Sequence, residues 1–410
     1  MHAYASEDPV FVAMNQRGQE ETDGELDNFC IQCHAPLANL EGVSTDGTNL
    51  DELSEEYQGV TCAFCHMVDG VEELHNNGLT IADDGDVRGP FNDPQPTTAH
   101  GSVYSALHDR AQLKSSDLCG SCHDVVTQNG LFLERTYDEW SHSLYNRETD
   151  KGGLTCSGCH MDGRDGLAAT SSTQTRRLHN HAFPGVDVAL VSFPQQDTQR
   201  QMVDEFLQTA IWAELCVEPT SNGTRVTVTL ENVTAGHAWP SGAAQDRRAW
   251  VELVATRSHT NDGLEQTQPD HVQETLFQSG VVADDVSISS IEDPNLWSLR
   301  DFLFDDNDEA VHMFWEGTSV QSELLPAPTT PNTQAPDYVQ THLSHEYELE
   351  GIHPESVTMR VRMRPIGLDI IDDLIESGHL DPIHRSAIPT LEVTAEPITW
   401  SVGMNTTCVP

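Results

Sequence analysis

The chain has 410 residues. It contains 66 acidic residues and only 20 lysines and arginines, which gives a formal net charge of −46. A field of this sign repels phosphate groups, which argues against nucleic acid or an anionic membrane surface as a partner. No apolar run reaches the roughly 18 residues of a membrane span, so no transmembrane helix is expected. The length suggests two or three domains.

The first half of the chain repeats one pattern, C-x-x-C-H, four times. This cysteine spacing occurs in zinc ribbons, redox dithiols and c-type haem sites. Zinc needs no histidine directly after the second cysteine, and disulfides within each repeat would leave four histidines unexplained. The pattern therefore predicts four covalent c-type haems. The motifs are Cys30, Cys33 and His34; Cys62, Cys65 and His66; Cys119, Cys122 and His123; Cys156, Cys159 and His160.

The spacing suits the chemistry of haem attachment. Two thiols add to the two vinyl groups of one porphyrin edge, and the histidine that follows is held under the iron as its proximal ligand. We number the predicted haems 1 to 4 in motif order. Four porphyrins would supply much of the apolar core of residues 1–195, so this predicted tetrahaem domain is expected to be loop-rich and partly helical. Short helices are expected near 102–113 and 136–145.

Hydrophobic periodicity changes near residue 196. Residues 197–212 have apolar side chains at helical spacing, and this helix is expected to pack between two domains. Beyond it, apolar and polar residues alternate, which predicts an antiparallel β-sandwich over 196–410 and a multidomain α+β protein overall. Residues 262–345 are interpreted as long excursions between strands, and a short helix is expected at 368–378. The expected strands lie in 224–233, 247–257, 356–364, 390–395 and 396–402.

Two cysteines, Cys216 and Cys408, lie outside the motifs. In an exported protein such a pair is most simply a disulfide, which here would close the β-domain. Two buried free thiols are the alternative.

Two acidic runs, at 83–86 and 305–309, offer carboxylates of the kind that calcium binds. Neither follows a known calcium-loop pattern. Calcium is thus a second cofactor to consider beside the haems, without further support from the sequence.

Six-coordinate irons need four further ligands on the distal faces of the haems. Met161 follows His160 directly and cannot reach the far face of the same haem. Histidines are abundant, and bis-histidine ligation would keep the reduction potentials low relative to Met/His ligation. The first 200 residues hold seven histidines outside the motifs: His2, His75, His100, His108, His142, His179 and His181.

Several segments carry a resemblance to a known family. They are "HAYASEDPVF", "FCIQCHAP", "GVTCAFCHMV", "RGPF" with "TTAHGSVYSAL", "LCGSCHD", "TYDEWSHS", "LTCSGCHM" and "HAFPG", and they cover about residues 2–186. In this order they resemble multihaem c-type cytochromes, which include the tetrahaem electron carriers of nitrifying bacteria and several extracellular, filament-forming cytochromes. The resemblance implies that His2, His100 and His181 are distal ligands.

A fourth distal ligand is expected from the second domain. Residues 232–253 resemble a GH-x-x-P-S/T-G turn found in β-domains attached to these cytochromes, and His237 of this turn is expected to reach back to an iron. In the alternative, His237 only caps a tight Pro-Ser-Gly turn. The reserve candidates, in order of preference, are His142, His108, His179 and His75.

These features predict an electron carrier rather than an enzyme. Four closely spaced haems would pass electrons along the chain to redox partner proteins or extracellular acceptors. The alternative is a multihaem reductase, which needs one iron with an open position and nearby proton donors. In a third interpretation, the β-domain is an adhesion or docking module.

C-type haem attachment takes place outside the cytoplasm, so the chain is expected to be periplasmic or extracellular. No secretory signal is recognisable, as expected of a mature chain whose export peptide is missing from this numbering. His2 precedes Cys30 by 28 residues on a segment with little apolar content, and such an arm can reach a neighbouring subunit. Head-to-tail contacts of this kind build a filament; the alternative is a monomeric periplasmic shuttle.

Overall fold

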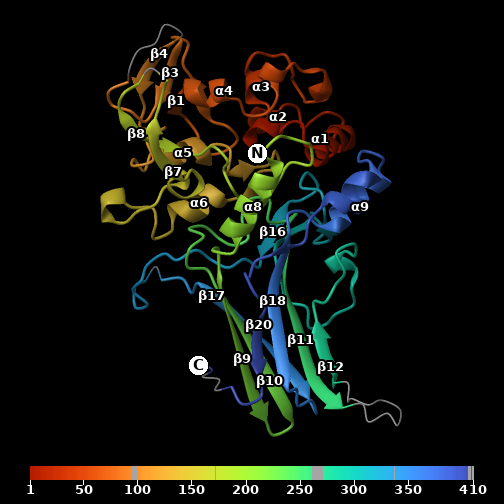
Figure 1. Cartoon of the computed structure of the whole chain (residues 1–410). Coiled ribbons are helices and arrows are strands. Elements are labelled where there is room, and N and C mark those ends of the chain that lie inside the picture. Colours follow the sequence, from red (N-terminus) through yellow and green to blue (C-terminus); the bar gives the residue numbers. More distant parts are fainter. Residues whose placement is uncertain (95–99, 171, 261–270, 337, 405–407, 409–410) are drawn as a thin grey trace.

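Figure 1 shows the fold as a computed structural model, which describes residues 1–94, 100–170, 172–260, 271–336, 338–404 and 408. Short helices and small strand pairs form one end of the molecule, and long antiparallel strands form the other. The chain is therefore a mixed α+β protein, as predicted.

Short helices and loops make up residues 1–195. The α-helices are α1 (Pro9–Glu21), α2 (Ile31–His34), α3 (Pro36–Leu40), α4 (Cys62–Met67), α5 (Ser115–Gly120), α6 (Thr136–Ser141) and α7 (Cys156–His160). The paired strands are β1 (Val68–Val71) with β2 (Leu79–Ile81), β3 (Asp86–Gly89) with β4 (Gly101–Tyr104), β5 (Val125–Val126) with β6 (Phe132–Glu134), and β7 (Gly163–Leu167) with β8 (Thr175–His179). Turns of 3-10 helix are η1 (His2–Tyr4), η2 (Leu50–Glu52), η3 (Glu55–Tyr57) and η4 (Thr149–Lys151).

The prediction of a helix over 102–113 is wrong. Residues 101–104 form β4, which pairs in parallel with β3, and turns follow until α5 begins. Nε2 of His108 hydrogen-bonds to the carbonyl oxygen of Cys65 at 2.8 Å. Long-range contacts therefore override the local helical propensity of this segment. The helix expected near 136–145 is present as the shorter α6.

The hydrophobic core of residues 1–195 is divided into small clusters. One cluster contains Ile31, Ala35, Ala38 and Leu50, and another contains Leu37, Phe64, Val68 and Leu107. Clusters of this size bury too little apolar surface to offset the entropy of so many ordered loops.

Two antiparallel sheets make up most of the second half (Figure 1). The smaller has the order β17-β10-β9, built from β9 (Trp212–Thr220), β10 (Gly223–Glu231) and β17 (His342–Glu350). The larger has the order β12-β11-β18-β19, with β13 beside β11 and β20 beside β18. Its strands are β11 (Arg248–Thr260), β12 (His271–Ser279), β13 (Ser298–Leu299), β18 (Ser356–Arg364), β19 (Leu391–Glu392) and β20 (Ile398–Ser401).

The alternation of apolar and polar residues decides which face of each strand is buried. Along β10 and β18, every second residue points into the protein and has almost no exposed surface. These inward residues meet in one hydrophobic cluster, so the two sheets face each other across a common core. The cluster includes Val226, Val228, Leu230, Val357, Met359 and Val361.

The segment interpreted as excursions between strands, 262–345, carries strands of its own. In its described part, β12 and β17 extend the two large sheets, and η5 (Ile288–Ser290) precedes β13. A third sheet consists of β14 (Asp301–Phe304), β15 (Ala310–Val311) and β16 (Ser319–Ser322). Leu303 of β14 packs against Leu131 and Leu133, so this sheet contacts the first half of the chain.

Two helices lie where the halves meet. The helix expected at 197–212 is present as α8 (Gln196–Leu207), which buries Val203 and Leu207. The helix expected at 368–378 is present as α9 (Leu368–Glu376); it shares a hydrophobic cluster with Ala13 of α1, and η6 (Pro382–Ala387) follows it. No helix in the described ranges is long and apolar enough to cross a membrane.

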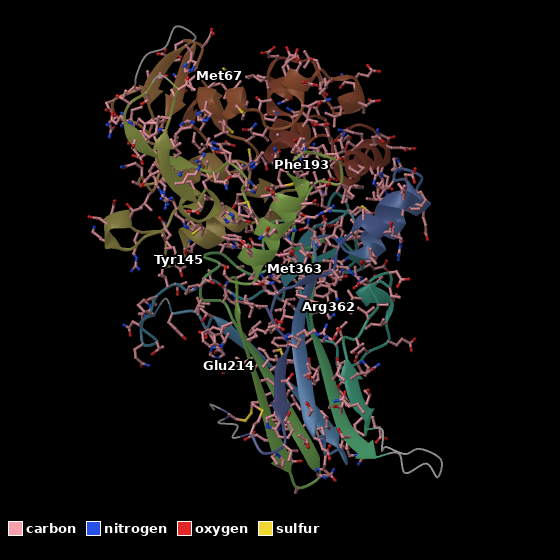
Figure 2. All side chains as sticks on the ribbon, viewed as in Figure 1. Met67, Tyr145, Phe193, Glu214, Arg362 and Met363 are labelled. Atoms are coloured by element: carbon pink, nitrogen blue, oxygen red, sulfur yellow. A yellow bond between two sulfur atoms is a disulfide. The ribbon has the colours of Figure 1, made fainter. Side chains whose placement is uncertain are left out.

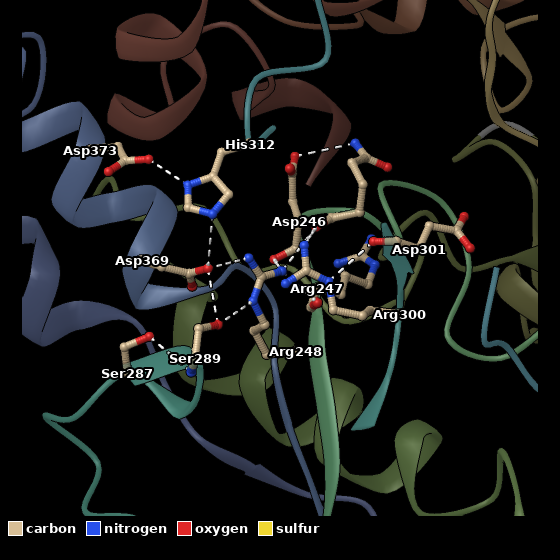
Figure 3. Close-up of polar contacts among 11 residues, drawn as sticks. Asp246, Arg247, Arg248, Ser287, Ser289, Arg300, Asp301, His312, Asp369 and Asp373 are labelled. Carbon is tan, nitrogen blue, oxygen red and sulfur yellow. Dashed lines mark hydrogen bonds and ion pairs between the residues drawn. The ribbon is translucent and has the colours of Figure 1, made fainter. Parts of the chain in front are cut away.

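A polar network around the buried Arg248 fixes the start of α9 (Figure 3). The Arg248 side chain of β11 is 2% exposed and pairs with Asp369 of α9 at 2.5 Å. The Ser289 hydroxyl donates to the same carboxylate at 3.1 Å, and His312 lies 2.6 Å from Asp373. Hydrogen bonds and charge therefore hold α9 to β11, while apolar contacts hold it to α1.

The predicted disulfide between Cys216 and Cys408 is present, with Cα atoms 5.2 Å apart. It is visible as a yellow bond near the C-terminal end in Figure 2. The disulfide ties β9 to the chain that follows β20, across 192 residues of sequence.

Candidate haem sites

Each C-x-x-C-H motif includes a helical turn. Residues three and four apart share a helix face, so the turn places both thiols and the histidine on one side. The hydroxyls of Thr61 and Thr155 cap α4 and α7, because they accept hydrogen bonds from the amides of Phe64 and Gly158. These caps satisfy donors that the first helical turn leaves free.

All eight motif cysteines are free thiols, so the structure contains no disulfide within a motif. Thiols of different motifs are hydrogen-bonded instead: Cys33 with Cys122, and Cys119 with Cys156. Cys65 also lies close enough to Cys122 for an electrostatic interaction. The third motif therefore lies next to the other three.

Backbone carbonyl groups fix the Nδ1 atoms of three motif histidines. A histidine that donates from Nδ1 carries its lone pair on Nε2, the atom that is then free to bind a metal. These three imidazoles are therefore oriented as Nε2 ligands. The contacts are His34 with Ala5 (3.1 Å), His66 with Arg88 (2.6 Å) and His160 with Pro184 (2.8 Å).

Three motif histidines face a second imidazole. A metal between two imidazoles separates the ring centroids by about 6.2 Å, since each side contributes a bond of about 2.0 Å and about 1.1 Å from nitrogen to ring centre. The spacing in this structure fits one iron between the rings of each pair. The pairs are His123 with His2 (6.0 Å), His66 with His181 (6.3 Å) and His160 with His237 (6.5 Å).

The facing histidines have a protonation state suited to metal binding. Nδ1 of His181 lies 3.1 Å from the carbonyl oxygen of His179, and Nδ1 of His237 lies 2.7 Å from that of Ala238. Burial lowers the pKa of His2 to about 3 and the pKa of His237 to about 4. Both rings are therefore neutral at neutral pH, as metal ligation requires. Their binding to haem iron stays a prediction.

The first motif differs from the other three. In the described part of the chain no second imidazole faces His34, whose ring stacks on Phe11 at 3.9 Å. His100 is exposed, and its Nδ1 lies 2.8 Å from the carbonyl oxygen of Gly101. It directly precedes β4, and the β4 strand lies at an outer edge of the molecule in Figure 1. The structure thus does not bring His100, a predicted distal ligand, to a motif histidine of its own chain.

The four reserve histidines make other contacts. His108 lies 5.4 Å from His66, nearer than the three pairs, and its Nε2 is bound to a backbone carbonyl oxygen. None of the four faces a motif histidine at the pair spacing in the described ranges. The other contacts are His142 Nδ1 with the Asp138 carbonyl oxygen (2.8 Å), His179 Nδ1 with that of Met161 (3.2 Å) and His75 Nε2 with the Glu73 carboxylate (3.9 Å).

The loop that carries His237 is bound to α6 of the first half. The Glu139 carboxylate accepts hydrogen bonds from the Ala238 amide (3.1 Å) and the Ser241 hydroxyl (2.7 Å). Ser241 also bonds to the Thr136 hydroxyl at 2.8 Å. Sequence reasoning missed the role of Glu139 and Thr136, although both lie in or beside "TYDEWSHS", one of the segments that carry the resemblance.

A cavity of about 210 Å³ opens beside the fourth motif. Cys159 and His160 line one side, and Met202 and Phe206 of α8 line another. The rings of Phe206 and His160 meet edge to face at 5.0 Å. Helix α8 therefore covers the place where the fourth haem is expected.

The acidic runs considered for calcium make local contacts. Asp84 pairs with Arg88 at 2.7 Å, and Asp305 accepts hydrogen bonds from the amides of Asn307 and Glu309. Within the described residues, neither run brings three ligand atoms within 4.8 Å of one another. The structure adds no support for calcium.

Comparison with known proteins gives one informative result. No protein-family model matches the chain, and none of the curated proteins matches it. Among solved structures, the chain is similar to a penta-haem cytochrome c552 from Thermochromatium tepidum, with a TM-score of 0.59 and 16% sequence identity. The match covers 91% of this chain and 83% of that one. The chain therefore has a fold like that of a multihaem cytochrome c.

Proposed function

We propose that this protein is an exported electron-transfer protein, a multihaem c-type cytochrome that carries four haems. The observation that carries the proposal is the spacing of three imidazole pairs, each formed by a C-x-x-C-H histidine and a histidine distant in sequence. The fold shared with a penta-haem cytochrome supports it.

The haems supply one-electron chemistry when bound. The two thiols of each motif would hold one ring, and the chain's backbone carbonyl groups would orient the axial imidazoles. Contacts between thiols of the third motif and those of the first, second and fourth support a haem arrangement in which haem 3 lies centrally. We propose that electrons pass through haem 3 to redox partner proteins or extracellular acceptors. The facing sheets of residues 196–410 would form a β-sandwich.

Mass spectrometry of the denatured protein tests the cofactor proposal. Thioether bonds survive denaturation, so the mass should equal that of the chain plus four haem groups. Absorption spectra should show low-spin haem. Bound zinc, or a haem number other than four, would contradict the proposal.

A second candidate function, a multihaem reductase, is favoured by one observation: His34 has no facing imidazole in the described residues. The Glu134 carboxyl lies near Cys33, and burial raises its pKa to about 7, so it is able to donate a proton at neutral pH. Carbon monoxide binding to the native reduced protein separates the two candidates. A reductase should bind it at one haem, whereas a carrier with four six-coordinate haems should not bind it.

The proposed assembly needs a donor other than His2. His2 faces its own His123, and its carbonyl oxygen accepts a hydrogen bond from the Val60 amide at 2.8 Å. The arm is therefore folded against its own chain, which removes the reason for expecting it to reach a neighbour. We propose instead that the exposed His100 of a second copy completes haem 1 beside His34, and that repetition of this contact builds a filament.

Substitution of His100 tests the assembly. The intact protein should form filaments at high salt, where its negative charge is screened, and all four haems should be low-spin. His100→Ala should be monomeric by size-exclusion chromatography and should carry one high-spin haem. If the intact protein is itself monomeric at high concentration and high salt, the filament proposal fails and the electron-carrier proposal survives.

A further inference from the structure

One short turn, residues 181–184, contacts three of the predicted haem sites. His181 faces His66 of the second motif. The carbonyl oxygen of Pro184 lies 2.8 Å from Nδ1 of His160, the histidine of the fourth motif. Between them, Phe183 contacts His2, which faces the histidine of the third motif. The turn thus links axial positions of haems 2, 3 and 4.

The Phe183 ring lies against two predicted distal ligands at once. Its centroid is 4.5 Å from that of His2, with the ring planes at 85°, and 5.8 Å from that of His181, with the planes at 89°. Edge-to-face contacts at such distances are attractive and directional. They also block rotation of each imidazole about the bond that it would make to a metal.

The backbone at Phe183 is held in a costly conformation. Its φ is +48°, in the left-handed region that bulky side chains avoid. The neighbouring residue is fixed on both sides: the Ala182 amide donates to the Asn180 side chain (2.9 Å), and the Ala182 carbonyl accepts from the Gln199 side chain of α8 (3.0 Å). Strain that is maintained in this way points to a function for the ring it places.

We propose that Phe183 is a positioning residue that sets the ring orientations of His2 and His181, and thereby the electronic properties of haems 3 and 2 together. The inference rests on the proposed function, since it requires those histidines to bind iron. The orientation of axial imidazoles and the polarity around them influence the spectrum and the reduction potential of a haem. The facing rings differ in orientation, by 79° for His123 and His2 and by 38° for His66 and His181.

The test is electron paramagnetic resonance of the oxidised holoprotein, combined with a redox titration. In Phe183→Leu, the low-spin signals of haems 2 and 3 should shift, and their potentials should fall as water reaches the ligands. The signal of haem 4, between His160 and His237, should stay. Separate His2→Ala and His181→Ala variants identify the two signals, because each converts one haem to high spin.

Three further variants separate the ring from the backbone. Phe183→Tyr keeps the ring and should give the wild-type spectrum. Phe183→Gly relieves the positive φ but lacks the ring, so it should resemble Phe183→Leu. Phe193→Leu is the matched control: the Phe193 ring stacks on Tyr4 at 4.5 Å and contacts no predicted ligand, so its loss should leave all signals in place. Haem content and thermal melting confirm that each variant is folded.

Two results would overturn the inference: an unchanged spectrum in Phe183→Leu, or an equal shift of every haem signal in that variant. Failure of the proposed function looks different, because the wild-type protein would then lack covalent haem by mass spectrometry. A protein with four haems and an unaffected Phe183→Leu spectrum would disprove the role of Phe183 alone.

Discussion

His160 and His237 lie with their ring planes 15° apart, whereas the planes of His123 and His2 are 79° apart. The three imidazole pairs are thus not equivalent, even though all four motifs share one five-residue pattern. What distinguishes them is the residue that faces each motif, together with the backbone group that holds it. We therefore expect the differences among the haems to be set by contacts between distant parts of the chain.

His237→Ala should convert haem 4 from low spin to high spin, because it removes one imidazole of the pair while leaving Cys156, Cys159 and His160 intact. Haem attachment should be unchanged. Absorption and electron paramagnetic resonance spectra measure the conversion. His142→Ala is the matched control, since His142 is exposed and faces no motif histidine. If His237→Ala keeps the wild-type spectrum, His237 is only a turn residue.

The sequence alone predicts the eight thiols and the four motif histidines as haem-binding residues, because one local pattern contains them, and this stays a prediction. The sequence was not sufficient to pair the distal histidines. His123 and His2 are 121 positions apart, and His66 and His181 are 115 apart, so their pairing depends on the fold. Residues outside the C-x-x-C-H motifs, such as Phe183 and Glu139, were missed because their roles depend only on the side chains that they contact in the fold.

At the scale of elements, α6 and the turn 237–242 meet through Glu139. Burial raises its pKa to about 7, against the lowering effect of the hydrogen bonds from Ser241 and Ala238. An unfolded glutamate titrates near 4.5. Between these values the folded chain keeps a proton that the unfolded chain has lost, so this residue makes stability fall as pH rises.

The Glu139→Gln variant should lose this part of the pH dependence. Between pH values of about 5 and 8, the Glu139 carboxyl should lower the free energy of unfolding of wild type by an amount on the order of 2 kcal/mol, and the variant should lack this loss. Denaturant unfolding of the holoprotein at both pH values measures the difference. An equal pH dependence in the two proteins would show that the Glu139 carboxyl is ionised at the lower pH.

The polar network in Figure 3 makes the docking of α9 sensitive to a single charge. Arg248→Ala should destabilise the protein by about 3–5 kcal/mol, because it leaves the buried Asp369 carboxylate without its arginine partner. Thermal or denaturant unfolding measures the loss. In the matched control Arg257→Ala, which breaks an exposed pair with Glu274, the cost should be below about 1 kcal/mol. Similar losses in both variants would contradict the buried role of Arg248.

Regular alternation made the long strands predictable, since β10 and β18 bury every second residue. Among the strands missed within 262–345, β14 and its neighbours are short, and β14 packs against the first half of the chain. The failed helix over 102–113 has a similar cause: pairing of β4 with β3 outweighs local propensity. Local patterns predict an element best where it is long and buries one continuous face. They predict it worst where it is short and is held by residues that are distant in sequence.

At the scale of the whole molecule, the Cys216–Cys408 disulfide closes most of the second half into one loop. Cys408→Ser should destabilise the protein by up to about 5 kcal/mol, because the open chain has more freedom when unfolded. Unfolding under oxidising conditions measures the effect. Adding a reductant should bring the wild-type protein to the stability of the variant; a wild-type protein that is indifferent to reductant would contradict this.

The position of His237 on the turn after β10 has a consequence for biogenesis. The fourth motif is complete at His160, and its thiols can receive haem before the later strands have been placed. Under the proposed function, the sixth ligand of haem 4 arrives only when β10 and the turn at 237–242 have docked on α6. Haem 4 should then be high-spin while the sheets are unformed and low-spin once they are in place, so its absorption spectrum should report the folding of the second half of the chain.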